Sequence, residues 1–237
     1  EGLEAAGTSF RQDSSNTPRG ENVKLHGSVS LSKCAETLDT VGLLQARFIA
    51  FDVETTGLSP RRDRIIQIGA VLFDGQKAAR RYATFVNPHF HIPSAATAIN
   101  HITDEMVAYA PSESEVVNSL CSFLGDALVG KTPLVAHNAP FDMNFLSEML
   151  QRNGISATIS YFDTLNLSRQ YLDDLPNYKQ PTVAAALDID TGTTHRADSD
   201  AETCGRILVS LIPAMQRNAE AVAERLARKQ PTHEEKG

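Results

Sequence analysis

Three apolar runs separated by turn residues open the strongly patterned part of the chain. Residues 48–51 form a short apolar run that ends in acidic residues, and residues 65–73 form a second, near-continuous run. Residues 82–86 form a third, more polar run. Asp74 and Gly75, between the second and third runs, are a strong hairpin signal. The pattern therefore predicts three consecutive strands in an antiparallel meander.

The pattern then alternates between helix and strand. Apolar residues predict helices near 116–124, 141–150, 164–173 and 181–187, and strands at 134–136 and 155–162. A last helix carries Cys204 and Met215 on one face, and Pro213 should end or kink it near Ile212. A meander followed by this alternation predicts an α/β fold, with a mixed five-stranded sheet and helices on both faces.

Domain boundaries follow from where the pattern is weak. Residues 1–46 are rich in turn and linker residues, so they predict a partly disordered N-terminal extension or linker, with a helix near residues 32–44. Residues 47–213 predict one globular domain, large enough to bury a stable core without disulfides or structural metals. Residues 214–237 are charged and amphipathic, which predicts a C-terminal helical tail.

Composition narrows the class of protein. The 237 residues carry 22 Lys and Arg against 29 Asp and Glu, and a net charge of −7 disfavours a non-specific grip on duplex nucleic acid. No apolar run approaches the roughly 18 residues of a membrane span, so we expect no membrane partner. Cys34, Cys121 and Cys204 are far apart and odd in number, which predicts a reducing, cytoplasmic location rather than a disulfide framework or zinc site.

Carboxylates stand at the ends of the predicted elements. Asp52 and Glu54 are two apart on the first strand, so their side chains point to the same face. Asp142 follows the strand at 134–136, and Asp200 stands near the start of the last helix. Each has a simpler explanation, because strand ends are often solvated and helix N-termini favour acids. Together, however, the four carboxylates stand at ends of elements that are expected to meet at one edge of the sheet.

Four converging carboxylates repel one another unless cations neutralise them. Hard oxygen ligands without cysteine select Mg²⁺ or Mn²⁺ rather than zinc. Two such ions about 3.5–4 Å apart serve displacement at phosphorus, since one generates the nucleophile and the other stabilises the leaving oxygen. His195, in the loop before the last helix, has an imidazole that can take a proton from water near neutral pH. A lone loop histidine is more often simply exposed.

Three segments resemble the motifs of one family. The segments are Asp52-Val53-Glu54-Thr55-Thr56-Gly57-Leu58, His137-Asn138-x-x-Phe141-Asp142 and His195-Arg196-Ala197-x-x-Asp200-Ala201. They resemble the three motifs of the DEDDh, or DnaQ-like, 3′–5′ exonucleases, over about residues 47–212. This family has a ribonuclease-H-like fold around two divalent metals, and it includes the proofreading subunit of the bacterial replicative polymerase.

The resemblance implies an activity and the residues that carry it. The activity is metal-dependent 3′–5′ hydrolysis of single-stranded or frayed DNA ends, releasing nucleoside 5′-monophosphates, with a DNA polymerase as a candidate partner. Asp52, Glu54, Asp142 and Asp200 would be the metal ligands, and His195 the general base. The residues implied to line or support the pocket of the terminal nucleotide are Thr55, Thr56, Gly57, Leu58, His101, Asn138 and Phe141.

The sequence also departs from the family pattern. Asp198 stands where relatives more often carry an apolar or small residue, and unless it points outward it would raise the pKa of His195. Asn100 and His101 replace the His-Gly pair of a substrate-lining element. Two alternatives stay open: an exoribonuclease of the same fold acting on RNA ends, and a catalytically silent module that binds nucleic acid or a polymerase.

Overall fold

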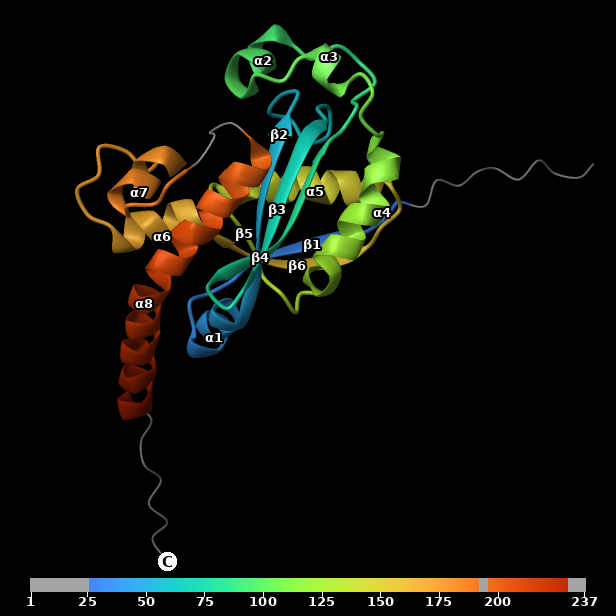
Figure 1. The fold of residues 1–237 in the computed structure, drawn as a ribbon. Coiled ribbons are helices and arrows are strands. Elements are labelled where there is room, and N and C mark those ends of the chain that lie inside the picture. The colour runs from blue at the N-terminus through green and yellow to red at the C-terminus, as the bar shows by residue number, and fades with distance from the viewer. Residues whose placement is uncertain (1–25, 192–195, 230–237) are drawn as a thin grey trace, which may run out of the picture.

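The computed structural model describes residues 26–191 and 196–229. Its six-stranded mixed sheet has the order β1-β6-β5-β2-β3-β4 (Figure 1). The strands are β1 (Val29–Lys33), β2 (Arg47–Thr55), β3 (Ile65–Asp74), β4 (Lys77–Phe85), β5 (Leu134–Ala136) and β6 (Ala157–Asp163). The helices are α1 (Leu38–Ala46), α2 (Ser94–Asn100), α3 (Asp104–Val107), α4 (Glu113–Leu124), the 3₁₀ helix η1 (Gly125–Leu128), α5 (Ala139–Arg152), α6 (Thr164–Tyr171), α7 (Gln180–Ala186) and α8 (Ala197–Lys229).

The predicted meander is confirmed. β2 pairs with β3 and β3 with β4, both antiparallel, and β5, β6 and β1 extend the sheet in parallel on the other side of β2. Gly75 turns the β3–β4 hairpin with a φ of +61°, a conformation that glycine adopts without the steric penalty of a side chain. The α/β fold with helices on both faces of the sheet is also as predicted.

The sheet has a sixth strand that the sequence pattern did not predict. β1 pairs in parallel with β6, from Val29 opposite Ala157 to Lys33 opposite Tyr161. It lies at the edge of the sheet, where most of its side chains are exposed. Because such a strand buries little, its sequence carries no continuous apolar run, and it falls among residues expected to form an extension.

Helix α1 lies near the predicted helix of residues 32–44 but begins later, at Leu38. Thr37 and Thr40 form a reciprocal capping box there, which satisfies main-chain N–H groups at the helix start. Val41 and Leu44 are fully buried in a core shared with α8. Residues 29–46 therefore contribute to the packed body of the molecule.

Pro213 was expected to end or kink α8 near Ile212, and the helix does not end there but continues through Pro213 to Lys229. Met215 and Ala219, beyond the proline, are buried in the core. This packing stabilises the helix past the hydrogen bond that proline cannot donate. Neither α8 nor any other helix within the described ranges is long and apolar enough to cross a membrane.

The two faces of the sheet decide where the acidic residues point. Odd-numbered residues 49–53 of β2 point into a core with α4 and α5, whereas Phe48 and Ala50 point into a second core with α1, α6, α7 and α8. Successive side chains of a strand alternate between faces. Asp52 and Glu54 therefore share the face of Phe48 and Ala50, which α8 covers.

Helices α2 and α3 lie beyond the end of β2, where the sequence predicted no element (Figure 1). They pack around a small third core that includes Ile66, Ile92 and Ile102. At seven and four residues, they are too short to show a helical repeat in the sequence.

Candidate active site

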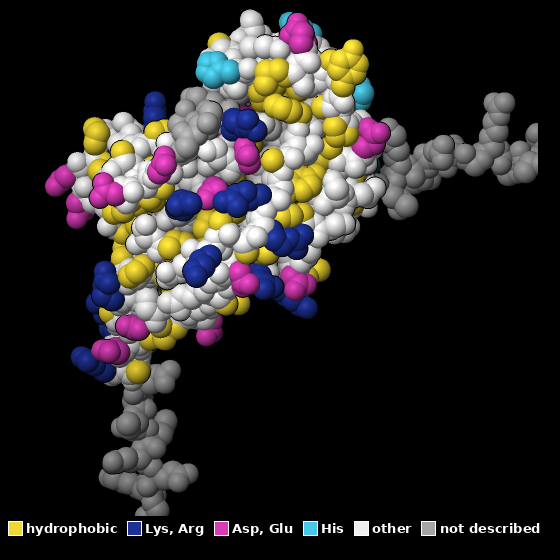
Figure 2. Space-filling model, in the orientation of Figure 1, with side chains coloured by type: hydrophobic (Ala, Val, Ile, Leu, Met, Phe, Trp, Pro, Cys, Tyr) yellow, Lys and Arg dark blue, Asp and Glu magenta, His cyan; other side chains and the backbone are white. Residues whose placement is uncertain are grey.

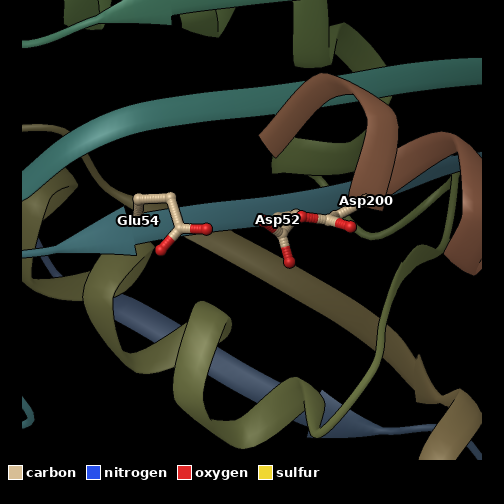
Figure 3. Close-up of side chains that lie close together, drawn as sticks. All are labelled: Asp52, Glu54 and Asp200. Carbon is tan, nitrogen blue, oxygen red and sulfur yellow. The ribbon is translucent and has the colours of Figure 1, made fainter. Parts of the chain in front are cut away.

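Three of the predicted carboxylates meet near the C-terminal end of β2 (Figure 3). Asp52 and Glu54 come from β2, and Asp200 comes from the first turn of α8. One oxygen of each lies within 4.8 Å of the others, and all three residues are partly buried. Asp200 reaches from the helix to the carboxylate of Asp52 in this view. Side chains 146 residues apart in the sequence, from Glu54 to Asp200, thus form one acidic cluster.

Asp142 lies beside this cluster. It belongs to the first turn of α5 and is only 3% exposed, and its Oδ1 accepts a hydrogen bond of 3.1 Å from the main-chain N–H of Val53. β5 pairs with β2 only at Ile49 and Ala50, so the N–H of Val53 is left to the helix that follows β5. The short neighbouring strand therefore leaves room for Asp142 beside Val53.

Close packing holds α8 over the sheet. Gly205 faces the ring of Phe73 on β3, and a Cβ atom at Gly205 would lie 2.1 Å from that ring. Gln180 of α7 donates a hydrogen bond of 2.9 Å to the main-chain oxygen of Asp200. These contacts hold α8 at Asp200 itself and at Gly205, five residues further along the helix.

Burial and mutual repulsion raise the pKa values of the acids. The pKa of Asp52 lies well above its usual value because of burial, and then because of Asp142, Glu54 and Asp200. Burial and the charge of Asp200 raise the pKa of Glu54 to about 7. Burial raises the pKa of Asp142 against the opposing hydrogen bond from Val53. Such a cluster favours the binding of positive charge, either as protons or as metal cations.

We expect the stability of the chelated protein to depend on Glu54 and pH. Between its ordinary pKa of 4.5 and its raised value of about 7, Glu54 binds more protons folded than unfolded. Its contribution to the free energy of unfolding therefore falls as the pH rises through this window. In EDTA, raising the pH from about 5 to 8 should destabilise the wild type more than Glu54→Gln. The difference between the two losses should be about 1 kcal/mol or more, which corresponds to roughly 2–4 °C in Tm. Parallel melting curves across this range would contradict the raised pKa.

A cavity of about 360 Å³ opens beside the acids, with a mostly apolar lining. The residues that line it are Val53, Glu54, Thr55, Thr56, Gly57, Leu58, Pro93, Ala95, Ala96, Ile99, Asn100 and Phe141. Five of the residues predicted to line the site are among them. Leu58 and Ile99 are 83% and 69% exposed, so each presents an apolar side chain to an incoming ligand. Glu54 belongs to both the cavity and the acidic cluster, so the two are continuous.

The two threonines of the first motif use their hydroxyls within the protein. Thr55 Oγ1 donates to the main-chain oxygen of Gly57 at 2.7 Å, and the N–H of Arg64 donates to Thr56 Oγ1 at 3.0 Å. A Cβ at Gly57 would lie 2.6 Å from the carboxylate of Asp63, so this loop turns tightly. Both hydroxyls therefore shape the wall of the cavity.

Asn100 lines the cavity, whereas the sequence predicted its neighbour His101 as the pocket residue of the same element. Asn100 is 3% exposed, and its amide donates to the main-chain oxygen of Thr55 at 3.1 Å while accepting from the N–H of Ile102. These bonds join the end of α2 to the end of β2. The resemblance placed Asn100 in a substrate-lining element, but its buried hydrogen bonds depend on the fold and could not be deduced from the sequence.

The other predicted residues lie around this cavity or outside the described ranges. His101 is exposed at the C-terminal cap of α2, with a φ of +58°, and is not part of the lining. Asn138 occupies the N-cap position of α5 with a φ of +70°; its side chain makes no capping bond, but its main-chain N–H donates to Asp163 Oδ1. His195 lies outside the described residues. The roles of these three residues stay predictions.

Ser199-x-x-Glu202 has the spacing of a capping box, but the start of α8 does not form one. The helix begins at Ala197, so Ser199 lies inside it and donates its hydroxyl to the main-chain oxygen of Thr191. Glu202 instead accepts hydrogen bonds from arginines of β4 and α8. Asp198 lies 3.5 Å from the guanidinium of Arg196. Glu202 is therefore held by ion pairs with the arginines of β4 and α8 and does not cap the helix.

Comparisons with known proteins agree with this geometry. The sequence model of the exonuclease family (RNase_T) matches residues 49–208. DNA polymerase III PolC-type of Caldanaerobacter subterraneus subsp. tengcongensis is 38% identical over 173 residues, which cover 73% of this chain and 12% of that protein. The PolC-type polymerase of Oceanobacillus iheyensis is 39% identical over 171 residues, with 72% and 12% covered. The chain thus spans about an eighth of the length of these curated relatives.

Solved structures give the same fold at lower sequence identity. A structure of exonuclease I matches with a TM-score of 0.64 and 19% identity over 77% of this chain and 46% of that one. Escherichia coli exonuclease I in complex with a dT13 oligonucleotide matches with a TM-score of 0.63 and 20% identity, over 80% and 45%. The likeness confirms the ribonuclease-H-like fold. Since the family model covers more than half of the chain, including all three acidic segments, the chain belongs to the DnaQ-like exonuclease family.

Proposed function

We propose that this chain is a metal-dependent 3′–5′ exonuclease, which hydrolyses the terminal phosphodiester bond of single-stranded or frayed DNA and releases nucleoside 5′-monophosphates. The observation that carries the proposal is the acidic cluster of Asp52, Glu54 and Asp200, which opens into an apolar cavity through Glu54. A nucleotide in that cavity would have its base among apolar side chains and its phosphate toward the acids. The cavity volume is within the range of small-ligand sites.

The donors of this site fit hard divalent cations. Carboxylate oxygens without cysteine or described histidine are the ligands that Mg²⁺ and Mn²⁺ prefer. Asp52, Glu54 and Asp200, with Asp142 beside them, would hold two such ions. When bound, the ions supply the positive charge that lowers the pKa of an attacking water and stabilises the leaving oxygen.

The remaining work falls to side chains of the chain itself. Leu58 and Ile99, exposed and apolar, would pack against the faces of the terminal base. The hydrogen bond from Val53 orients Asp142, and the packing of α8 orients Asp200. His195 precedes the helix that carries Asp200, and it is the proposed general base that takes the proton of the attacking water.

The surface charge supports binding that is confined to the end of a nucleic-acid strand. On the face drawn in Figure 2, basic side chains over β4 and α8 are interspersed with acidic ones. Glu202, for example, is paired with both Arg81 and Arg206, at 2.6 and 2.7 Å. Paired arginines neutralise few phosphates, so we infer that binding depends weakly on salt.

DNA is the proposed substrate rather than RNA, and a DNA polymerase the proposed partner. The curated relatives are named DNA polymerase III PolC-type, and exonuclease I of the same fold has been solved with a DNA oligonucleotide. A cytoplasmic location is proposed on the same ground, together with three free cysteines.

The test is a side-by-side digestion of matched DNA and RNA oligonucleotides labelled at the 5′ end. Each is offered single-stranded, paired, and mismatched at the 3′ terminus, with Mg²⁺ or Mn²⁺. We expect products that shorten from the 3′ end, fastest on single-stranded and mismatched DNA, with release of nucleoside 5′-monophosphates. EDTA should stop the reaction, and Ca²⁺ should bind without supporting it well.

The control is Asp52→Ala protein purified in parallel, which reports any contaminating nuclease. Faster digestion of RNA than of DNA would favour the exoribonuclease alternative. A protein that binds Mn²⁺ and oligonucleotide but cleaves neither nucleic acid would favour the silent binding module.

A further inference from the structure

Two residues of β3 lie directly opposite the two acids of β2. The strand register pairs Asp52 with Gly69 and Glu54 with Gln67. Opposite residues of an antiparallel pair point to the same face of the sheet, here the face that α8 covers. Gln67 and Gly69 both contact the first residue of α8, Ala197. The strand beside the acids therefore also meets the helix that supplies the third acid.

Gln67 fixes the start of α8 with a hydrogen bond. Its side chain is buried at 5% exposure, and its Oε1 accepts a bond of 3.2 Å from the main-chain N–H of Ala197. N–H groups in the first turn of a helix have no partner inside the helix. Ala197 is itself fully buried, so its N–H depends on this amide rather than on solvent.

Gly69 lets the same turn approach the sheet. A Cβ atom at this position would lie 2.0 Å from both the carbonyl carbon and the oxygen of Ala197, and 2.3 Å from the N atom of Asp198. These neighbours are main-chain atoms, so a side chain at Gly69 would push the helix start away. Glycine in the interior of a strand is often found where another backbone comes this close.

The contacts bear directly on Asp200. It follows Ala197 by three residues, within the same turn, so a shift of the helix start moves its carboxylate relative to Asp52 and Glu54. We propose that Gln67 and Gly69 are positioning residues, which set the start of α8 so that Asp200 completes the cation site. The proposal rests on the proposed function, because it assigns a purpose to the acidic cluster.

Two disruptive variants and one conservative variant test the proposal. Gly69→Ala displaces the helix start, and Gln67→Leu keeps apolar packing but leaves the N–H of Ala197 without an acceptor. Both should weaken Mn²⁺ binding and lower kcat by about 10–100-fold, the usual scale for residues that orient metal ligands. KM for the oligonucleotide should stay within about twofold, because the cavity is lined by other elements. Gln67→Glu keeps an acceptor oxygen and should restore most of the binding.

Gly42→Ala is the matched control. Gly42 lies in α1, where a Cβ atom would have no neighbour within 4 Å, so binding and turnover should be unchanged. Mn²⁺ binding is measured by titration calorimetry and oligonucleotide cleavage by steady-state kinetics, with thermal unfolding to verify that each variant is folded. Should Gly69→Ala fail to fold, the comparison of Gln67→Leu with Gln67→Glu decides alone.

The outcomes separate this inference from the proposed function. Folded variants with unchanged Mn²⁺ binding, or a loss larger than that of Asp200→Asn, would overturn the positioning role, since it acts through Asp200. A loss confined to KM would do the same. A wild-type protein that binds Mn²⁺ but cleaves no nucleic acid would refute the proposed function, and the calorimetric comparison would still decide the inference. A wild-type protein that binds no Mn²⁺ would overturn both.

Discussion

Asp52→Asn should lower kcat by about 10³-fold or more, because several kcal/mol of transition-state stabilisation by a metal site is lost with one of its anionic oxygens. The same variant should unfold at an equal or higher temperature than the wild type when both are chelated. Burial and the charges of Asp142, Glu54 and Asp200 raise the pKa of Asp52, so its charged form strains the folded state. An amide of the same shape removes that strain.

The measurement combines single-turnover cleavage of a 5′-labelled oligonucleotide with thermal unfolding in EDTA. Asp74→Asn is the matched control, because Asp74 pairs with Arg47 at the opposite end of the β2–β3 ladder and both side chains are more than half exposed. It should keep kcat within about twofold, as expected for an exposed ion pair. Cleavage by Asp52→Asn within tenfold of the wild-type rate would show that Asp52 holds no essential ion.

His195→Ala should slow hydrolysis by about 10²–10⁴-fold, the usual contribution of a general base. A base acts in its neutral form, so the wild-type rate should rise with pH as His195 loses its proton. The variant should lack that rise, which a merely structural histidine would leave in place. The profile of kcat/KM against pH, measured at saturating Mn²⁺, is the deciding readout.

His26→Ala is the control for this variant, because His26 is exposed and precedes β1 at the edge of the sheet. It should leave both the rate and its pH profile unchanged. If His195→Ala turns over at near the wild-type rate, the base is another group and the proposed role of His195 is refuted.

The fold was predictable where local pattern and packing agree. Long apolar runs and the Asp74-Gly75 turn define β3 and its hairpin from the sequence alone. β1 was not predicted, because an exposed edge strand buries too few side chains to show an apolar run in the sequence. The course of α8 past Pro213 depends on the burial of Met215 and Ala219, and tertiary packing of this kind outweighs the local preference of one residue.

The site divides in the same way. The common direction of Asp52 and Glu54 follows from their spacing on a strand, so the sequence by itself implies it. The part of the cavity wall that α2 supplies could not be deduced in this way, because this helix, which carries Ile99, has only seven residues. The inward hydroxyl of Thr56 is bonded to Arg64, eight residues away, and nothing in the local pattern predicts that bond.

The placement of the acids on β2 is decided by a count of residues along the strand. One residue inserted between Ala50 and Asp52 would turn both carboxylates to the face of α4 and α5, away from Asp200. Many exchanges of side chain in this strand would preserve their direction, whereas a single-codon insertion or deletion would reverse it. The gene segment for β2 is therefore expected to tolerate codon substitutions far more readily than insertions or deletions.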